Sequence, residues 1–160
     1  MRRAGVVVLL LTAAVSAAPV PKVKRSEADR VRDALPGHWE VVESTFKPNS
    51  RWEEGFEFDD TVVSHTIDTG QVEQFHWYYR VATVDGVVCL DVWVTDGNKT
   101  VLMAGVVKRT ADDELVWRKG SEREVAGDLP EPADVTDRPS WEAKLTNWVI
   151  EYRLKRRPPG

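Results

Sequence analysis

The alternation of apolar and polar residues through the middle of the chain is the feature that most constrains its fold. One face of the segment 72–84 carries four large residues, Phe75, Trp77, Tyr79 and Val81. Asp85-Gly86, a dipeptide typical of two-residue hairpin turns, follows, and the segment 88–94 then repeats the alternation. A period of two is that of a β-strand, in which successive side chains point to opposite faces. The two segments therefore predict a β-hairpin with one buried face.

The same period recurs on both sides of this hairpin and predicts seven or eight strands in all. The expected segments are His38–Phe46, Phe56–Phe58, Val63–Ile67, Val72–Val84, Val88–Val94, Thr100–Arg109, Glu114–Lys119 and Trp148–Arg156. Short turns join them, which is typical of an antiparallel meander. Eight such strands can close without free edges, around side chains or one small ligand. We therefore expect a mainly β, up-and-down antiparallel barrel of about eight strands with a short N-terminal helix; a sandwich is the alternative.

Two segments depart from the strand pattern. Glu27–Ala34 is predicted to be the helix, because Ser26 is a favourable N-cap and Asp29 lies three residues later. Pro36-Gly37 ends it. The segment Gly120–Ser140 is charged, contains three prolines and lacks periodicity. We interpret it as a surface excursion without regular structure; a functional loop is the alternative.

The first seventeen residues have the pattern of a secretory signal peptide. Arg2 and Arg3 precede an uncharged, mostly aliphatic run over Ala4–Val15, and Val15-Ser16-Ala17 supplies the small residues that a signal peptidase requires. The run is shorter than the roughly 20 apolar residues that a membrane-spanning helix needs. We therefore expect a periplasmic or secreted protein. Its expected organisation is a signal peptide over 1–17, a linker over 18–25 and one barrel domain over 26–157.

Charge and cysteine content exclude some partners. The chain has 22 basic and 26 acidic side chains and a formal net charge of −4, which becomes −6 when Arg2 and Arg3 are removed. Such a surface repels nucleic acid and anionic lipid, so we expect no nucleic-acid partner and no membrane insertion after signal removal. Cys89 is the only cysteine, so no internal disulfide can form. We expect a free thiol and a monomer.

The residue types that carry chemistry form no recognisable constellation. The three histidines, His38, His65 and His76, lack partners at metal-ligand spacing. No nucleophile motif is present, and the paired carboxylates lie at expected turns, where solvated side chains are the rule. We therefore expect no metal, no cofactor and no enzymatic activity. The seven tryptophans favour a core filled by aromatic packing; an aromatic-lined cavity is the alternative.

Three local patterns resemble a known family. They are Pro36-Gly37-His38-Trp39 at the first strand, Gly105-Val106-Val107-Lys108 followed by Asp113-Glu114-Leu115, and Arg138-Pro139-Ser140-Trp141-Glu142 before a last strand that ends in Leu154-Lys155-Arg156. Their order over 35–157 resembles a family of uncharacterised, exported, lipocalin-like domains that is expanded in planctomycete bacteria. The resemblance implies a barrel and an extracytoplasmic location, and no established activity.

The last expected strand carries a charged residue on its inward face. Its apolar side chains occupy even positions from Trp148 through Leu154, and continuing this period places Arg156 next to the core, where a charge needs a partner. By resemblance to lipocalins, Arg156 should cover Trp39 of the opening strand and close the base of the barrel. Arg153, on the outward face, is the alternative.

Three functions are compatible with these features. The first is binding of a small apolar ligand by the inward residues Phe75, Trp77, Tyr79, Leu90, Val92 and Met103. The second is a structural or protein-interaction domain whose barrel is filled by side chains. The third is an enzyme that acts through acids at the barrel mouth. An internal cavity would favour the first over the second, and titratable groups that converge in one cleft would favour the third.

Overall fold

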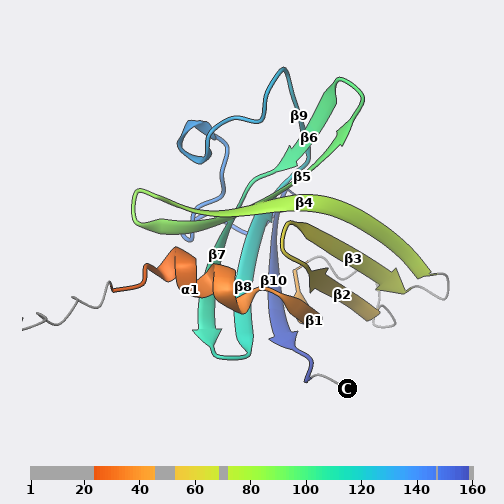
Figure 1. The fold of residues 1–160 in the computed structure, drawn as a ribbon, viewed down its shortest axis with the longest axis vertical. Helices are drawn as coiled ribbons and strands as arrows, with labels where there is room; N and C mark the ends of the chain where they lie inside the picture. The colour runs from red at the N-terminus through yellow and green to blue at the C-terminus, as the bar shows by residue number, and fades with distance from the viewer. Residues whose placement is uncertain (1–23, 46–52, 69–71, 147, 159–160) are drawn as a thin grey trace, which may run out of the picture.

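The chain folds into a closed antiparallel β-barrel of eight strands (Figure 1). The computed structural model describes residues 24–45, 53–68, 72–146 and 148–158; the predicted signal peptide and Phe46 lie outside them. The barrel strands are β1 (Gly37–Ser44), β2 (Glu53–Phe58), β3 (Val62–Asp68), β4 (Val72–Val84), β5 (Val87–Asp96), β7 (Gly105–Ala111), β8 (Glu114–Gly120) and β10 (Val149–Arg156). Each pairs with the next in this order, and β10 pairs with β1. The predicted barrel is therefore confirmed, and the sandwich is excluded.

The hairpin of β4 and β5 has the predicted turn. Asp85 and Gly86 have φ angles of 51° and 80°, which a two-residue turn of the primed type requires at both positions. The first half of the 13-residue strand β4 pairs with β3, and its second half pairs with β5. This long strand therefore forms a continuous part of the barrel wall (Figure 1).

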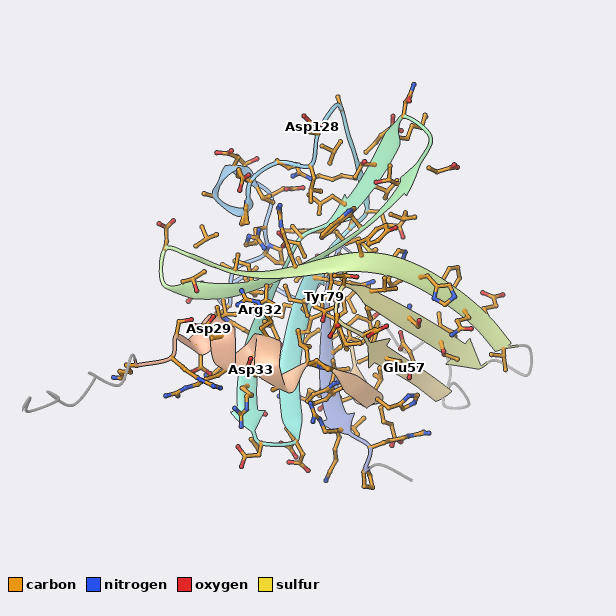
Figure 2. The ribbon with its side chains drawn as sticks, viewed as in Figure 1. Asp29, Arg32, Asp33, Glu57, Tyr79 and Asp128 are labelled. Atoms are coloured by element: carbon orange, nitrogen blue, oxygen red, sulfur yellow. The ribbon has the colours of Figure 1, made fainter. Side chains whose placement is uncertain are left out.

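The helix α1 (Glu27–Ala34) has the predicted bounds and covers one end of the barrel. Ser26 and Asp29 form a capping box, in which each side chain bonds the backbone N–H of the other. Ala28 and Val31 are buried in the barrel core. On the same helix, Arg32, which is labelled in Figure 2, donates a 2.8 Å hydrogen bond to the carbonyl oxygen of Val81 in β4. Helix burial and this bond fix α1 against the barrel.

The half of the barrel beneath α1 is filled by side chains. Trp39 is fully buried, and its indole N–H donates a 2.7 Å hydrogen bond to the carbonyl oxygen of Leu35. The guanidinium carbon of Arg156 lies 5.0 Å from the centre of the Trp39 ring, so the predicted contact is present. Arg153, the alternative, is instead 54% exposed and pairs with Glu43 on the outer face.

The predicted strand Thr100–Arg109 is wrong in one respect, because it is divided at Ala104 into β6 (Lys99–Met103) and β7. The C-terminal half of β5 pairs with β6, whereas Cys89 in its N-terminal half pairs with Val106 of β7. The hairpin of β5 and β6 therefore extends beyond the barrel (Figure 1). The apolar run continues through the break, so only the change of pairing partner divides the strand.

The segment Gly120–Ser140, predicted to lack regular structure, packs on the β5–β6 hairpin instead. It contains β9 (Arg123–Val125), which pairs with β6, and the 3-10 helix η1 (Pro132–Asp134). Val135 is buried in a small second core with Leu102. Asp128 lies near the tip of this segment in Figure 2.

A buried ion cluster joins the same segment to the barrel wall. Asp91 of β5 has a fully buried side chain. Both of its carboxylate oxygens accept hydrogen bonds from Arg138, and Arg80 donates to one of them at 3.1 Å. The alternation placed Asp91 on the outward face of β5, where a charge would normally meet solvent. The segment that follows β8 covers this face and supplies the counter-charge.

Two further predictions concern single residues. Trp148 does not continue the inward face of the last strand: it precedes β10 and is 52% exposed. The inward positions of β10 begin with Ile150, which packs against the core. Cys89 is free, as predicted, and is buried.

Candidate functional site

A pocket opens at the end of the barrel opposite α1. Its volume is about 300 Å³, and it is lined by Glu54, His65, Ile67, Phe75, Trp77, Lys119, Glu122, Ile150 and Tyr152. The lining strands contribute the start of β2, β4 and β10 and the end of β3 and β8, which meet at one rim because neighbouring strands are antiparallel. The volume lies at the lower end of the range for small-molecule sites.

Flat rings line part of this pocket and continue into the core next to it. Tyr152 lines the pocket, and the buried Phe56 meets the rings of Tyr152 and Trp117 edge to face, with centroids 5.3 and 5.4 Å apart. In the wall, Phe75 and Trp77 stack with centroids 6.0 Å apart. Planar surfaces of this kind favour stacking or edge contacts with a planar ligand.

Glu54 and His65 form a buried pair from neighbouring strands. The Nε2 atom of His65 lies 2.5 Å from Oε1 of Glu54, and the two side chains are 5% and 11% exposed. Burial lowers the pKa of His65, against the opposing hydrogen bond and charge of Glu54. A neutral imidazole with its proton on Nε2 donates this hydrogen bond to Glu54. The pair can therefore give or take a proton beside the pocket.

Lys119 is the most unusual residue of the site. It is 7% exposed, and its Nζ atom lies 5.5 Å from the ring centres of Trp77 and Tyr152 and 5.9 Å from that of Trp117. Its hydrogen-bond partner is the thioether sulfur of Met103, at 3.6 Å. Among the described residues, no carboxylate oxygen lies within 4.0 Å of Nζ. A buried amine without a counter-ion is costly when it is charged.

Tyr152 completes the polar part of the pocket. Burial, followed by the charge of Glu54 and a hydrogen bond to it, raises the pKa of the Tyr152 phenol. The phenol therefore stays protonated at neutral pH and can donate to Glu54. Glu54, His65, Lys119 and Tyr152 thus converge on one cleft, and the aromatic rings give the remainder of the cleft an apolar character.

The residues predicted to contact a ligand are divided between this pocket and the filled core. Phe75 and Trp77 line the pocket, and Met103 lies beside it, in contact with Lys119. The remaining three, Tyr79, Leu90 and Val92, are buried in the core. The structural pair of Trp39 and Arg156 lies at the opposite end, beneath α1.

Sequence reasoning missed Glu54, Lys119 and Tyr152 as site residues and set His65 aside. The signal that could have found them is the alternation itself. Lys119 has the same parity as Trp117 in β8, and Glu54 has the same parity as Phe56 in β2. Both therefore belong to the inward faces of their strands, where a charged residue needs an explanation.

Other features of the described residues are less suited to a ligand. A hollow of about 470 Å³ lies between α1 and the β7–β8 turn, but it is open to solvent and mostly polar; it is lined by Glu27, Arg30, Arg109, Thr110, Ala111 and Asp112. Within the described ranges, no three potential metal-ligating side chains come together. No helix in the described part of the chain has the length and apolarity needed to cross a membrane.

Comparisons with protein-family models, curated proteins and solved structures find no significant match to this chain.

Proposed function

We propose that this chain is an extracytoplasmic, lipocalin-like domain that binds a small, largely apolar molecule in the pocket at the open end of its barrel. The observation that carries the proposal is the combination of an aromatic-walled cavity of about 300 Å³ with buried polar groups at one side of it. A side-chain-filled barrel, the second function considered from the sequence, would leave no such space. The ligand that fits best has a flat apolar body and one polar end.

The polar end of the ligand would meet the cluster of Glu54, His65, Lys119 and Tyr152. Lys119 lacks a carboxylate partner among the described residues, so a ligand oxygen would give its Nζ atom an acceptor that the protein does not provide. The apolar body would lie along Phe75 and Trp77. This arrangement follows the usual pattern of small-molecule sites, in which a few polar groups orient a mostly apolar ligand.

Binding of a planar test compound is the direct experiment. Cinnamyl alcohol has a flat conjugated body and one hydroxyl, and its binding is measured by calorimetry or ligand-observed NMR. We expect saturable binding that Phe75→Ala weakens about fivefold or more, because about 1 kcal/mol of apolar contact is lost. Tyr78→Ala is the matched control, since Tyr78 is an exposed aromatic residue on the outer face of the same strand. Absence of binding, or equal effects of the two substitutions, would contradict the proposal.

The extracytoplasmic part of the proposal rests on residues 1–17. N-terminal sequencing of the exported protein should begin after Ala17, with Ala18 as the neighbouring alternative. An exported chain that retains Met1 would contradict it.

The convergence of titratable groups supports a second candidate, an enzyme that acts at the barrel mouth. The pair of Glu54 and His65 supplies an acid–base couple in the pocket wall. Native mass spectrometry of protein purified from its own host can identify a co-purifying small molecule. A molecule that the protein releases unchanged supports binding, whereas one that it converts during incubation supports catalysis.

A further inference from the structure

We propose that Lys119 is a covalent attachment site, at which its amine forms an imine with an aldehyde or ketone group at the polar end of a flat apolar ligand. The inference rests on the proposed binding function and names the chemical class of the ligand. Lys119 reaches the pocket from the end of β8, and its Nζ atom lies between three aromatic rings and a thioether. These neighbours offer the amine no strong hydrogen-bond acceptor.

The surroundings of Lys119 favour the uncharged amine, which is the nucleophilic form. Burial lowers the pKa of Lys119, and the charges of Glu54 and Glu122 oppose this effect. His65 and Tyr152 are the other titratable groups that line the pocket. The three rings stabilise an ammonium through cation–π contacts, which are worth about 2 kcal/mol or more at a desolvated site. Burying an ammonium without a carboxylate partner costs several kcal/mol, and burial is the largest effect on the pKa of Lys119, so Lys119 loses its proton more readily than an exposed lysine does.

The groups needed for imine formation are present in the same pocket. The lone pair of Nζ attacks the carbonyl carbon, and the resulting carbinolamine then loses water. In the balanced reaction, one C=O bond and two N–H bonds are replaced by one C=N bond and two O–H bonds. Glu54 and His65, which share a 2.5 Å contact, can accept the amine protons and return them to the leaving oxygen. No oxidant, reductant or metal is required.

The shape of the pocket determines which carbonyl compounds fit. The stacked rings of Phe75 and Trp77 line the path to Lys119, so a planar, conjugated body is favoured over a branched one. A carbonyl group at the end of such a body can reach Nζ while the body lies along these two rings. The volume of about 300 Å³ admits one ligand of moderate size.

Reductive trapping tests the proposal on the intact protein. The chain is incubated at pH 7 with cinnamaldehyde and sodium cyanoborohydride, which reduces an imine to a stable secondary amine. Proteolysis and mass spectrometry then locate the adduct. Among the lysines, we expect the adduct on Lys119 at about tenfold or greater yield than on any exposed lysine, because exposed lysine amines are almost fully protonated at this pH; the α-amino group, with a lower ordinary pKa of about 8, is scored separately.

Two variants and one analogue make the result decisive. Lys119→Met removes the amine with little change in apolar volume and should abolish the specific adduct, whereas Lys155→Gln, at an exposed site on β10, should leave it unchanged. Site mapping on the unaltered chain is valid whether or not Lys119→Met folds. Adducts scattered over exposed lysines with Lys119 unmodified would overturn the proposal. If cinnamyl alcohol still binds in that case, only the covalent step fails; if it does not bind, the proposed function fails as well.

Discussion

Removal of the Arg156 guanidinium tests the contact that closes the base of the barrel. The guanidinium lies over the Trp39 ring at 5.0 Å and also donates to the carbonyl oxygens of Ala34 and Pro36, at the end of α1 and in the turn that follows. The ring contact is worth about 0.5–2 kcal/mol, and a hydrogen bond from a charged donor about 1.5–3 kcal/mol. Because these contributions share one side chain and are not additive, we expect Arg156→Ala to lower the free energy of unfolding by about 2–3 kcal/mol.

A double-mutant cycle separates the ring contact from the carbonyl hydrogen bonds. Trp39 is fully buried, so Trp39→Ala should cost about 3–5 kcal/mol. The double variant should be more stable than the sum of the single effects predicts, by about 0.5–2 kcal/mol, because both substitutions remove the same contact. Trp39→Phe, which retains a smaller ring, provides a milder form of the cycle in case Trp39→Ala does not fold.

Urea denaturation followed by far-UV circular dichroism measures each free energy. Arg153→Ala is the matched control on the same strand. Its ion pair with Glu43 at 3.1 Å is exposed, and Glu151, 3.7 Å from Arg153, keeps its closer partner Arg118, so the expected loss is below about 0.5 kcal/mol. Additivity within about 0.3 kcal/mol, or an effect of Arg156→Ala no larger than that of Arg153→Ala, would refute the reasoning.

Three further predictions address other parts of the fold. Gly105→Ala should lower the free energy of unfolding in urea by about 3 kcal/mol, because an added Cβ would lie 2.5–2.8 Å from an indole nitrogen and two carbonyl oxygens. Gly120→Ala is the control and should cost far less, because the nearest atom to an added Cβ there is 3.6 Å away. Equal losses for the two variants would contradict this account. Asp91→Asn should lower the free energy of unfolding by about 3–5 kcal/mol, because it leaves the Arg138 guanidinium buried without its carboxylate. Limited proteolysis should then cleave the segment after β8 faster. An unchanged cleavage rate would argue that this ion pair does not hold the segment against the barrel. His65→Phe should reduce the loss of stability between pH 7 and pH 5. The folded-state pKa of His65 is lowered, so acid protonates the unfolded chain first and favours unfolding as the pH falls below about 6.5; parallel pH profiles of the two proteins would exclude this contribution.

Local patterns in the sequence predicted most of the secondary structure of this protein. The helix has its predicted bounds because the capping box and the Pro36-Gly37 stop are interactions between near neighbours. The β4–β5 hairpin was predicted for the same reason, since the turn dipeptide and the period of two are local features. The position of Arg156 over Trp39 followed from alternation along one strand together with a family resemblance.

The candidate site was only partly predictable. The alternation placed Phe75 and Trp77 on the inner face, and both line the pocket. The alternation gave no indication of which end of the barrel is filled and which is open, because that depends on which rings from different strands lie at the same level along the barrel axis. The convergence of Glu54, His65 and Lys119 was not predictable for a similar reason. They lie on three different strands, and only closure of the barrel brings them together.

The sequence by itself determined the helix, most of the strands and most of their inward faces, because these depend on spacing over a few residues. The tertiary structure alone decided that β5 exchanges β7 for β6 as its partner, and therefore where the run through Ala104 divides into β6 and β7. It also decided that Asp91, on the outward face of β5, is buried beneath the segment that carries Arg138. Burial of a side chain depends on every segment that packs against it, and some of those segments lie more than forty residues away along the chain.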